Sequence, residues 1–109
     1  MKIDFSTIER KSLPAFQGGE KAFDVHMFND GLNKIMKGHL EPGASIGLHT
    51  HETSSEIIFL VSGHGSLIDD GERKAVKAGD CLYCPKGHSH SLINDSDSAL
   101  DFLAVVPNQ

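Results

Sequence analysis

Positive charge and long apolar runs are both scarce in this sequence, and each shortage excludes a class of protein. Lysine and arginine together number 10 against 15 acidic residues, for a net charge of −5. A basic surface for nucleic acid or for an anionic membrane is therefore missing. No apolar run approaches the roughly 20 residues that a membrane-spanning helix needs. Residues 1–10 carry acids and lack the apolar core of a secretory signal, so we expect a cytoplasmic location.

Cysteine is also rare, and the only two are Cys81 and Cys84. Their Cys-x-x-Cys spacing is shared with redox and zinc sites, but a second such pair is missing. The surrounding Cys-Leu-Tyr-Cys-Pro is typical of a strand that runs into a proline turn. Period-two alternation would then send the two side chains to opposite faces. We therefore expect buried free thiols.

A 3.6-residue helical period is the third absence. The sequence instead has short alternating runs between turn signals, which predicts an all-β sandwich or barrel. Strands are expected over 23–27, 33–41, 46–49, 57–61, 66–69, 73–76, 81–84, 88–94 and 99–106. Residues 1–20 are expected to be mostly loop or edge strand, with 11–20 interpreted as loop. The continuous apolar run 57–61 is expected to be covered on both faces.

The length and composition indicate one domain over residues 1–109. Of these residues 39% are hydrophobic and 23% charged, an ordinary balance for a globular protein. One modest core can form, and many proteins of this size gain further burial by pairing.

Three histidines and a glutamate stand where one metal ion could hold them. His49 and His51 are two apart on an expected strand, so both point to one face, with Cα atoms roughly 6.7 Å apart. On the opposite face Ile46 and Leu48 would pack. Glu56 follows a short polar turn, and His90 arrives from a distant strand. Imidazole and carboxylate are ligands for zinc, iron, manganese and nickel, and this set would leave positions open on an octahedral ion.

The spacing around these residues is more specific than any one of them. It reads Gly-x5-His-x-His-x4-Glu-x6-Gly and then Gly-x5-Pro-x-Gly-x2-His-x3-Asn, and this resembles the two motifs of the cupin superfamily. The matching residues are Gly43, His49, His51, Glu56, Gly63, Gly79, Pro85, Gly87, His90 and Asn94. The motifs span 43–63 and 79–94, and the flanking strands carry none.

The resemblance implies a small single-domain cupin, a double-stranded β-helix barrel that commonly forms a homodimer. It is similar to the short stand-alone cupins often labelled mannose-6-phosphate isomerase-like. The superfamily includes dioxygenases, isomerases, decarboxylases and non-enzymatic binding proteins, so the fold does not fix the function. The leading hypothesis is a metal-dependent dioxygenase, isomerase or lyase acting on a small oxygenated metabolite. The alternatives are a non-catalytic module that binds a small ligand or sugar and, more weakly, a purely structural metal site.

Three residues near the ligands are candidate proton carriers. His88, two before His90, is a candidate partner, proton carrier or competing ligand, and equally a loop residue outside the barrel mouth. Glu52 is a candidate base beside the open positions or a solvated turn carboxylate. Tyr83 is expected to line the pocket or to pack in the barrel wall.

Arginine is scarce as well, and Arg10 and Arg73 are both outside the expected barrel lining. Enzymes that hold carboxylates or phosphates commonly use a bidentate arginine. Its absence argues against a phosphosugar isomerase and against a dioxygenase that clamps a substrate carboxylate. Lys34, Lys37 or Lys86 could substitute only as a point charge, so a small neutral or chelating ligand fits better.

Overall fold

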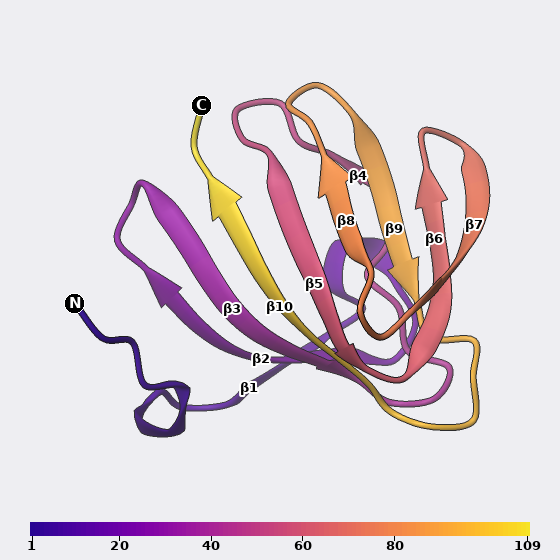
Figure 1. The fold of residues 1–109 in the computed structure, drawn as a ribbon, viewed down its shortest axis with the longest axis horizontal. Helices are drawn as coiled ribbons and strands as arrows, with labels where there is room; N and C mark the ends of the chain where they lie inside the picture. Colours follow the sequence, from indigo (N-terminus) through magenta and orange to yellow (C-terminus); the bar gives the residue numbers. More distant parts are fainter.

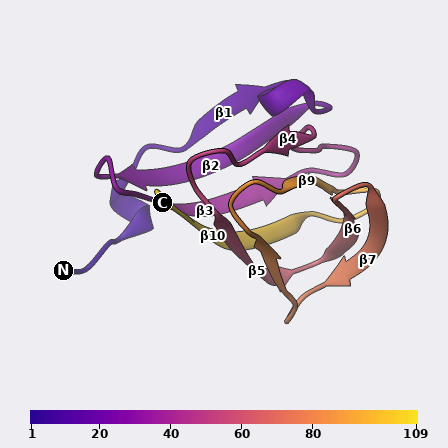
Figure 2. The same ribbon diagram turned by 90° about the horizontal axis from the view of Figure 1, so that it is seen from above.

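The computed structural model describes all of residues 1–109, and its strands form two antiparallel sheets. Figures 1 and 2 show the sheets curving around a shared interior. The larger sheet has the strand order β1-β2-β3-β10-β5-β8. Its strands are β1 (Lys11–Pro14), β2 (Ala22–Asn29), β3 (Asn33–Leu40), β10 (Leu100–Pro107), β5 (Glu56–Ser62) and β8 (Cys81–Cys84).

The smaller sheet has the order β4-β9-β6-β7. Its strands are β4 (His49–Thr50), β9 (Ser89–Ile93), β6 (His64–Asp69) and β7 (Glu72–Lys77). The helical segments are the 3-10 turns η1 (Phe5–Thr7) and η2 (Phe16–Gly18), and neither has the length and hydropathy to traverse a lipid bilayer. The predicted all-β barrel is confirmed.

Alternate residues of the strands fill the interior, as the period-two pattern predicts. The buried apolar residues are Phe23, Val25, Met36, Leu40, Ala44, Ile46, Ile58, Leu60, Leu67, Val76, Leu82, Leu92, Leu100, Phe102, Ala104 and Val106. The rings of Phe23 and Phe102 stack with their centroids 5.7 Å apart. Gly38 lies beneath them, where a Cβ atom would be 2.4 Å from the Phe102 ring. A glycine there leaves the space that this aromatic pair occupies.

The hairpin between β6 and β7 turns as its sequence predicts. Asp69 pairs with Glu72, which leaves Asp70 and Gly71 as a two-residue loop. Both loop residues have positive φ, 48° and 85°. A type I′ turn requires this backbone at both positions, and aspartate followed by glycine adopts it readily.

The prediction that 57–61 is covered on both faces is wrong. Ile58 and Leu60 are buried, but Phe59 and Val61 on the opposite face are 50% and 58% exposed. A continuous apolar run is ambiguous, because it fits a strand buried on both faces and also a strand whose outer face is apolar but uncovered. No element of this chain covers the outer face of β5.

Two further predictions need correction near the start of the barrel. Residues 11–20 are not all loop, because Lys11–Pro14 pairs with β2 as an edge strand. The expected strand over 46–49 is reduced to His49–Thr50, and Leu48 is 62% exposed although Ile46 is buried. The alternation breaks between these two residues, so Leu48 does not pack as expected.

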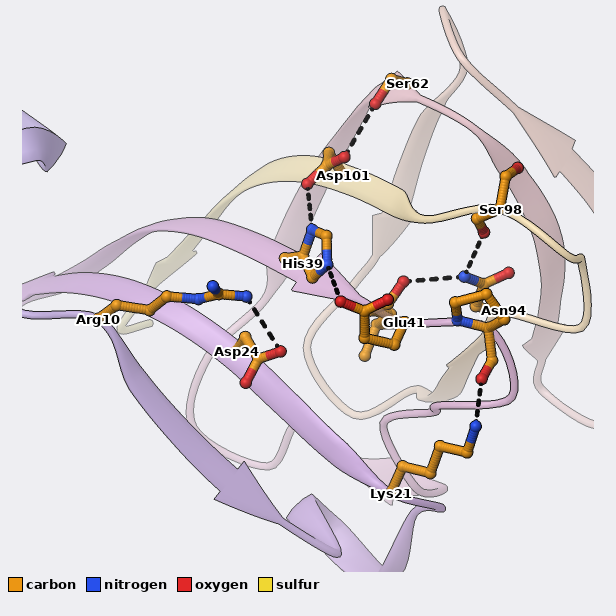
Figure 3. A network of polar contacts seen from close by, with 11 residues as sticks. Arg10, Lys21, Asp24, His39, Glu41, Ser62, Asn94, Ser98 and Asp101 are labelled. Atoms are coloured by element: carbon orange, nitrogen blue, oxygen red, sulfur yellow. Dashed lines mark hydrogen bonds and ion pairs between the residues drawn. The ribbon is translucent and has the colours of Figure 1, made fainter.

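A polar network ties the strands together on the outer side of the large sheet (Figure 3). His39 of β3 donates from Nδ1 to Asp101 of β10 at 2.6 Å and from Nε2 to Glu41 at 3.0 Å. Ser62 of β5 donates to the other oxygen of Asp101. Burial lowers the pKa of His39, but the hydrogen bonds and charges of the two carboxylates outweigh it, so the pKa lies above 6.5.

The motif residue Asn94 closes the same end of the barrel. Its side chain is fully buried and donates to the backbone oxygens of Leu40 and Ser98, while its own oxygen accepts from Ser96. A buried amide with all these partners fixes the loop that follows β9.

We predict that His39 stabilises the fold in a pH-dependent way. Because its folded-state pKa is raised, the gain is complete below the unfolded value of about 6.5 and is lost as the pH rises through the folded-state pKa. Urea unfolding of the wild type and of His39→Gln between pH 5 and 9 measures it. The stability difference should be largest at the acid end. A pH-independent difference for His39→Gln would contradict this account.

Candidate metal centre

Strand pairing brings together residues that are far apart in the sequence. The two-residue strand β4 pairs with β9 so that His49 lies directly opposite His90. The backbone of His51 is held next to the same strand, because its N–H donates to the oxygen of His88 and its oxygen accepts from Gly87. Glu56 is the first residue of β5 and is buried.

The four predicted ligand residues converge on one point. One ligand atom from each of His49, His51, Glu56 and His90 lies within 4.8 Å of the other three. The Nε2 atom of His90 is 3.0 Å from that of His51 and 3.1 Å from that of His49. One carboxylate oxygen of Glu56 lies 2.9 Å from His90 and 3.2 Å from His51. The sequence-based prediction that these four side chains meet is confirmed.

The outer nitrogens of two of these imidazoles are fixed by hydrogen bonds. Nδ1 of His49 donates to the backbone oxygen of Gly47 at 2.7 Å, which leaves the Nε2 lone pair of the neutral ring facing the cluster. Nδ1 of His51 lies 3.0 Å from the hydroxyl of Ser54. Such outer contacts orient metal-binding histidines.

Gly47 also supports His49 through a close backbone approach. A Cβ atom at this position would be 2.0 Å from the backbone oxygen of Gln17, and Gly47 N donates to the oxygen of Phe16. Only glycine allows η2 to lie this close to the segment that leads into β4.

The electrostatics of the cluster suit a cation. Burial lowers the pKa of His49, and the neighbouring imidazoles lower it further against the opposing effect of the Gly47 carbonyl, so the ring is neutral near pH 7. Burial raises the pKa of Glu56, but hydrogen bonds and charge from His51 and His90 outweigh it and lower the pKa to about 2. A neutral imidazole and an ionised carboxylate are the forms that bind a metal.

The donor set therefore fits a divalent transition metal. Three imidazole nitrogens at these separations cannot all donate hydrogen bonds to one another, whereas a cation among them would satisfy their lone pairs and the carboxylate. Nitrogen and oxygen donors suit zinc, iron, manganese or nickel. The predicted cofactor class agrees with this site, and the geometry does not select one metal.

A cavity of about 330 Å³ opens beside the cluster. It falls within the usual size range of small-molecule sites. Its lining residues are Phe16, Gln17, Phe23, Met27, Lys34, Met36, Ile46, His49, Thr50, His51, Glu52, Thr53, Ser54, Glu56 and Val106. Three of the four candidate ligands thus face a space that a small molecule could enter.

Of the three candidate proton carriers, only Glu52 lines this cavity. The ring of His88 is half-exposed and pairs with Asp70, and the residue contacts the site through its backbone bond to His51. Tyr83 is 57% exposed on the outer face of the large sheet.

Neither arginine lies near the cavity, as expected, but one lysine does. Arg10 pairs with Asp24 and Arg73 with Asp95, and neither arginine lines the cavity. Lys34, one of the three lysines considered as a point charge, does line it.

Sequence reasoning missed the contribution of η2, because residues 11–20 were interpreted as loop. Phe16 and Gln17 both line the cavity, and Gln17 has a positive φ of 54°. The Gly18-Gly19 pair was the available signal, since Gly19 approaches the backbone of Ser45 too closely for any Cβ atom.

The cysteines are outside the metal cluster. They lie on opposite faces of β8, as predicted, and both are free. Cys84 is buried, and burial raises the pKa of its thiol to about 11. Cys81 is exposed, so the prediction that it is buried is wrong; it lies on the uncovered outer face.

A family model described as the cupin domain matches residues 36–106, about two thirds of the chain. The chain belongs to the cupin family. This assigns the two-sheet barrel to the cupin double-stranded β-helix and agrees with the resemblance seen in the motifs.

Comparison with known proteins gives three informative relatives of this cupin. Over 67 residues it is 43% identical to the oxalate-binding protein of Thermotoga maritima, covering 62% of this chain and 55% of that protein. The chain spans about half the length of the curated relatives that it matches. A crystal structure from Thermotoga maritima, described as a predicted oxalate decarboxylase, superposes with a TM-score of 0.92 at 30% identity, covering 100% of both chains. A cupin-superfamily sugar phosphate isomerase of Silicibacter pomeroyi gives 0.81 at 25% identity, covering 100% of this chain and 76% of that one.

We predict that the purified cupin contains about one divalent transition metal per chain. Replacing His90 removes a ligand that is 4% exposed and leaves an unfilled space at the centre of the cluster. Metal affinity should therefore fall at least about tenfold. Elemental analysis of purified His90→Ala should accordingly find much less metal per chain than in the wild type. His64→Ala, which changes an exposed histidine, should keep its metal. Full metal occupancy in His90→Ala would contradict the assignment.

Proposed function

We propose that this cupin binds a small oxyacid that chelates a divalent transition metal held by His49, His51, Glu56 and His90. The main supporting observation is that three imidazoles and one buried carboxylate converge beside an open cavity, which three of the four residues line. The metal, when bound, would offer a Lewis acid to oxygen donors of the ligand. Because the site opens into a cavity, this role is better supported than that of a closed structural site.

The comparisons support the ligand class. The relative from Thermotoga maritima is named for oxalate, which chelates through two oxygens. The cavity also lacks an arginine that could clamp a free carboxylate. The metal would therefore carry most of the recognition of an acid, with Lys34 at the mouth as an additional positive charge.

Turnover is the second candidate, and it rests on Glu52. This exposed carboxylate lines the same cavity as the metal ligands, so it could carry a proton to or from a bound ligand during a reaction. Proton transfer by Glu52 would support lyase or isomerase chemistry, two of the three reaction types expected from the sequence; a dioxygenase would in addition need dioxygen as a co-substrate. His88 and Tyr83 do not line the cavity, so we propose no role for them in proton transfer.

One experiment tests binding and turnover together. Thermal unfolding of the metal-loaded protein with oxalate should show a midpoint that rises with oxalate concentration, as mass action requires. His49→Ala should abolish the rise. A screen for product by mass spectrometry then separates the two candidates, since Glu52→Gln would lower turnover by roughly 100-fold or more without weakening oxalate binding. Absence of any stabilisation by oxalate or by other chelating acids would overturn the proposal.

We also propose that the protein is a homodimer paired through the outer face of the large sheet. Phe59, Val61, Tyr83 and Leu103 are 41–58% exposed there, and register places Phe59 beside both Leu103 and Cys81. We call Phe59, Val61, Cys81, Tyr83 and Leu103 the outer patch. It carries no charged residue, so it can face a copy of itself across a two-fold axis without repulsion, although each chain has a net charge of −5.

The dimer predicts a specific response to charge. Phe59→Lys would place like charges opposite one another at the interface, and it should raise the dimer dissociation constant by at least about 30-fold. Leu48→Lys, at a residue of similar exposure outside the outer patch, should leave the constant unchanged. Sedimentation equilibrium measures both. A wild-type protein that is monomeric throughout the accessible concentration range would refute this interface.

A further inference from the structure

The cavity beside the metal cluster has two chemically different walls. One carries the metal ligands from β4, β5 and the loop between them. The other is apolar and comes mainly from β2, β3 and β10. Its residues are Phe16, Phe23, Met27, Met36, Ile46 and Val106. Most of these side chains are core residues, whereas Phe16 and Met27 are only partly buried. A ligand that contacts only the metal would leave the exposed part of this wall uncovered.

The apolar wall is a continuous surface. Met27 of β2 and Met36 of β3 are directly paired in the sheet, and Lys34 pairs with Val106 of β10. The ring of Phe16 packs on that of Phe23 with a centroid distance of 5.4 Å. Paired methionines and aromatic rings that line the same cavity form an adaptable surface that accepts apolar groups of differing shape.

Oxalate has no carbon substituent with which to contact this wall. It would fill the metal-facing side of the cavity and leave uncovered the part of the apolar wall that the cavity exposes, including the partly buried Phe16 and Met27. Burial of apolar surface is the main favourable term in binding, so a ligand that also covers this wall would bind more tightly.

The charges around the cavity favour a monoanion. A divalent ion with one carboxylate and three neutral imidazoles has one net positive charge. Lys34 and Glu52 are exposed residues of the cavity lining with opposite charges, so together they add no net charge. A ligand with a single carboxylate would make the site neutral, whereas oxalate would leave one negative charge uncompensated beside an apolar wall.

We propose that the preferred ligand is a 2-oxo acid with an apolar substituent, held by the metal through its carboxylate and keto oxygens. This inference rests on the proposed metal-dependent binding of oxyacids and specifies its ligand class. The substituent lies against Met27 and Met36, and its size is about that of an isobutyl or benzyl group.

Two ligands with the same head group test the apolar wall. Isothermal titration of zinc-loaded protein should give a dissociation constant for 4-methyl-2-oxopentanoate that is roughly 10- to 100-fold lower than for pyruvate. Oxalate, titrated beside them, should also bind more weakly than 4-methyl-2-oxopentanoate. Equal constants for the two oxo acids, or tightest binding of oxalate, would overturn the inference and leave the proposed function standing. Retained zinc with no binding of any of the three acids would overturn both.

A matched pair of variants locates the contact. Met27→Gln keeps the length of the side chain and makes its end polar, so it should remove most of the difference between the two oxo acids while the constant for pyruvate stays within about twofold. Leu32→Gln makes a similar change at a residue that is 68% exposed in the turn before β3, and it should have no effect. A full preference for the longer acid in folded Met27→Gln would show that the apolar wall does not bind the substituent.

Discussion

The pairing of β4 with β9 is the constraint on which the metal centre depends. It pairs His49 with His90 and Thr50 with Ser89, although β4 and β9 are far apart in the sequence. The backbone of His51, just after β4, is held against the turn that precedes β9 by its bonds to Gly87 and His88. Without this short contact the two histidine motifs would lie on separate parts of the barrel. The motif glycine at 87, with a φ of 87°, makes the turn that lets the second segment meet the first.

The large sheet has two apolar faces with different roles. Its inner face completes the core and, at one end, supplies the apolar wall of the cavity through Met27, Met36 and Val106. Its outer face carries the outer patch on β5, β8 and β10, next to a polar network built around His39. An antiparallel sheet can leave one face to water, but the outer patch is an apolar part of that face which no element of this chain covers. This asymmetry gives a physical reason for two copies to associate.

Much of the fold was predictable because strand alternation and turn residues are local properties. The β6–β7 hairpin follows from Asp70-Gly71, and β2 follows from the alternation of Phe23, Val25 and Met27. The failures occurred where burial depends on partners that are distant in the sequence. The sequence of the run 57–61 does not reveal that its outer face stays uncovered. Cys81 was expected to be buried for the same reason, and Leu48 was misplaced because the strand alternation breaks just before it.

The sequence by itself determined the ligand types, the expected barrel and the scarcity of arginine near the site, because residue identity and spacing carry that information. Only the tertiary structure decided which side chains share the cavity. It placed Glu52 and Lys34 at the mouth, turned His88 toward Asp70, and put Tyr83 on the opposite side of the sheet. It also brought Phe16 and Gln17 of η2 against Gly47, through a close backbone contact that no local pattern encodes. Such contacts join segments about thirty residues apart, and they exist only after the two sheets have closed.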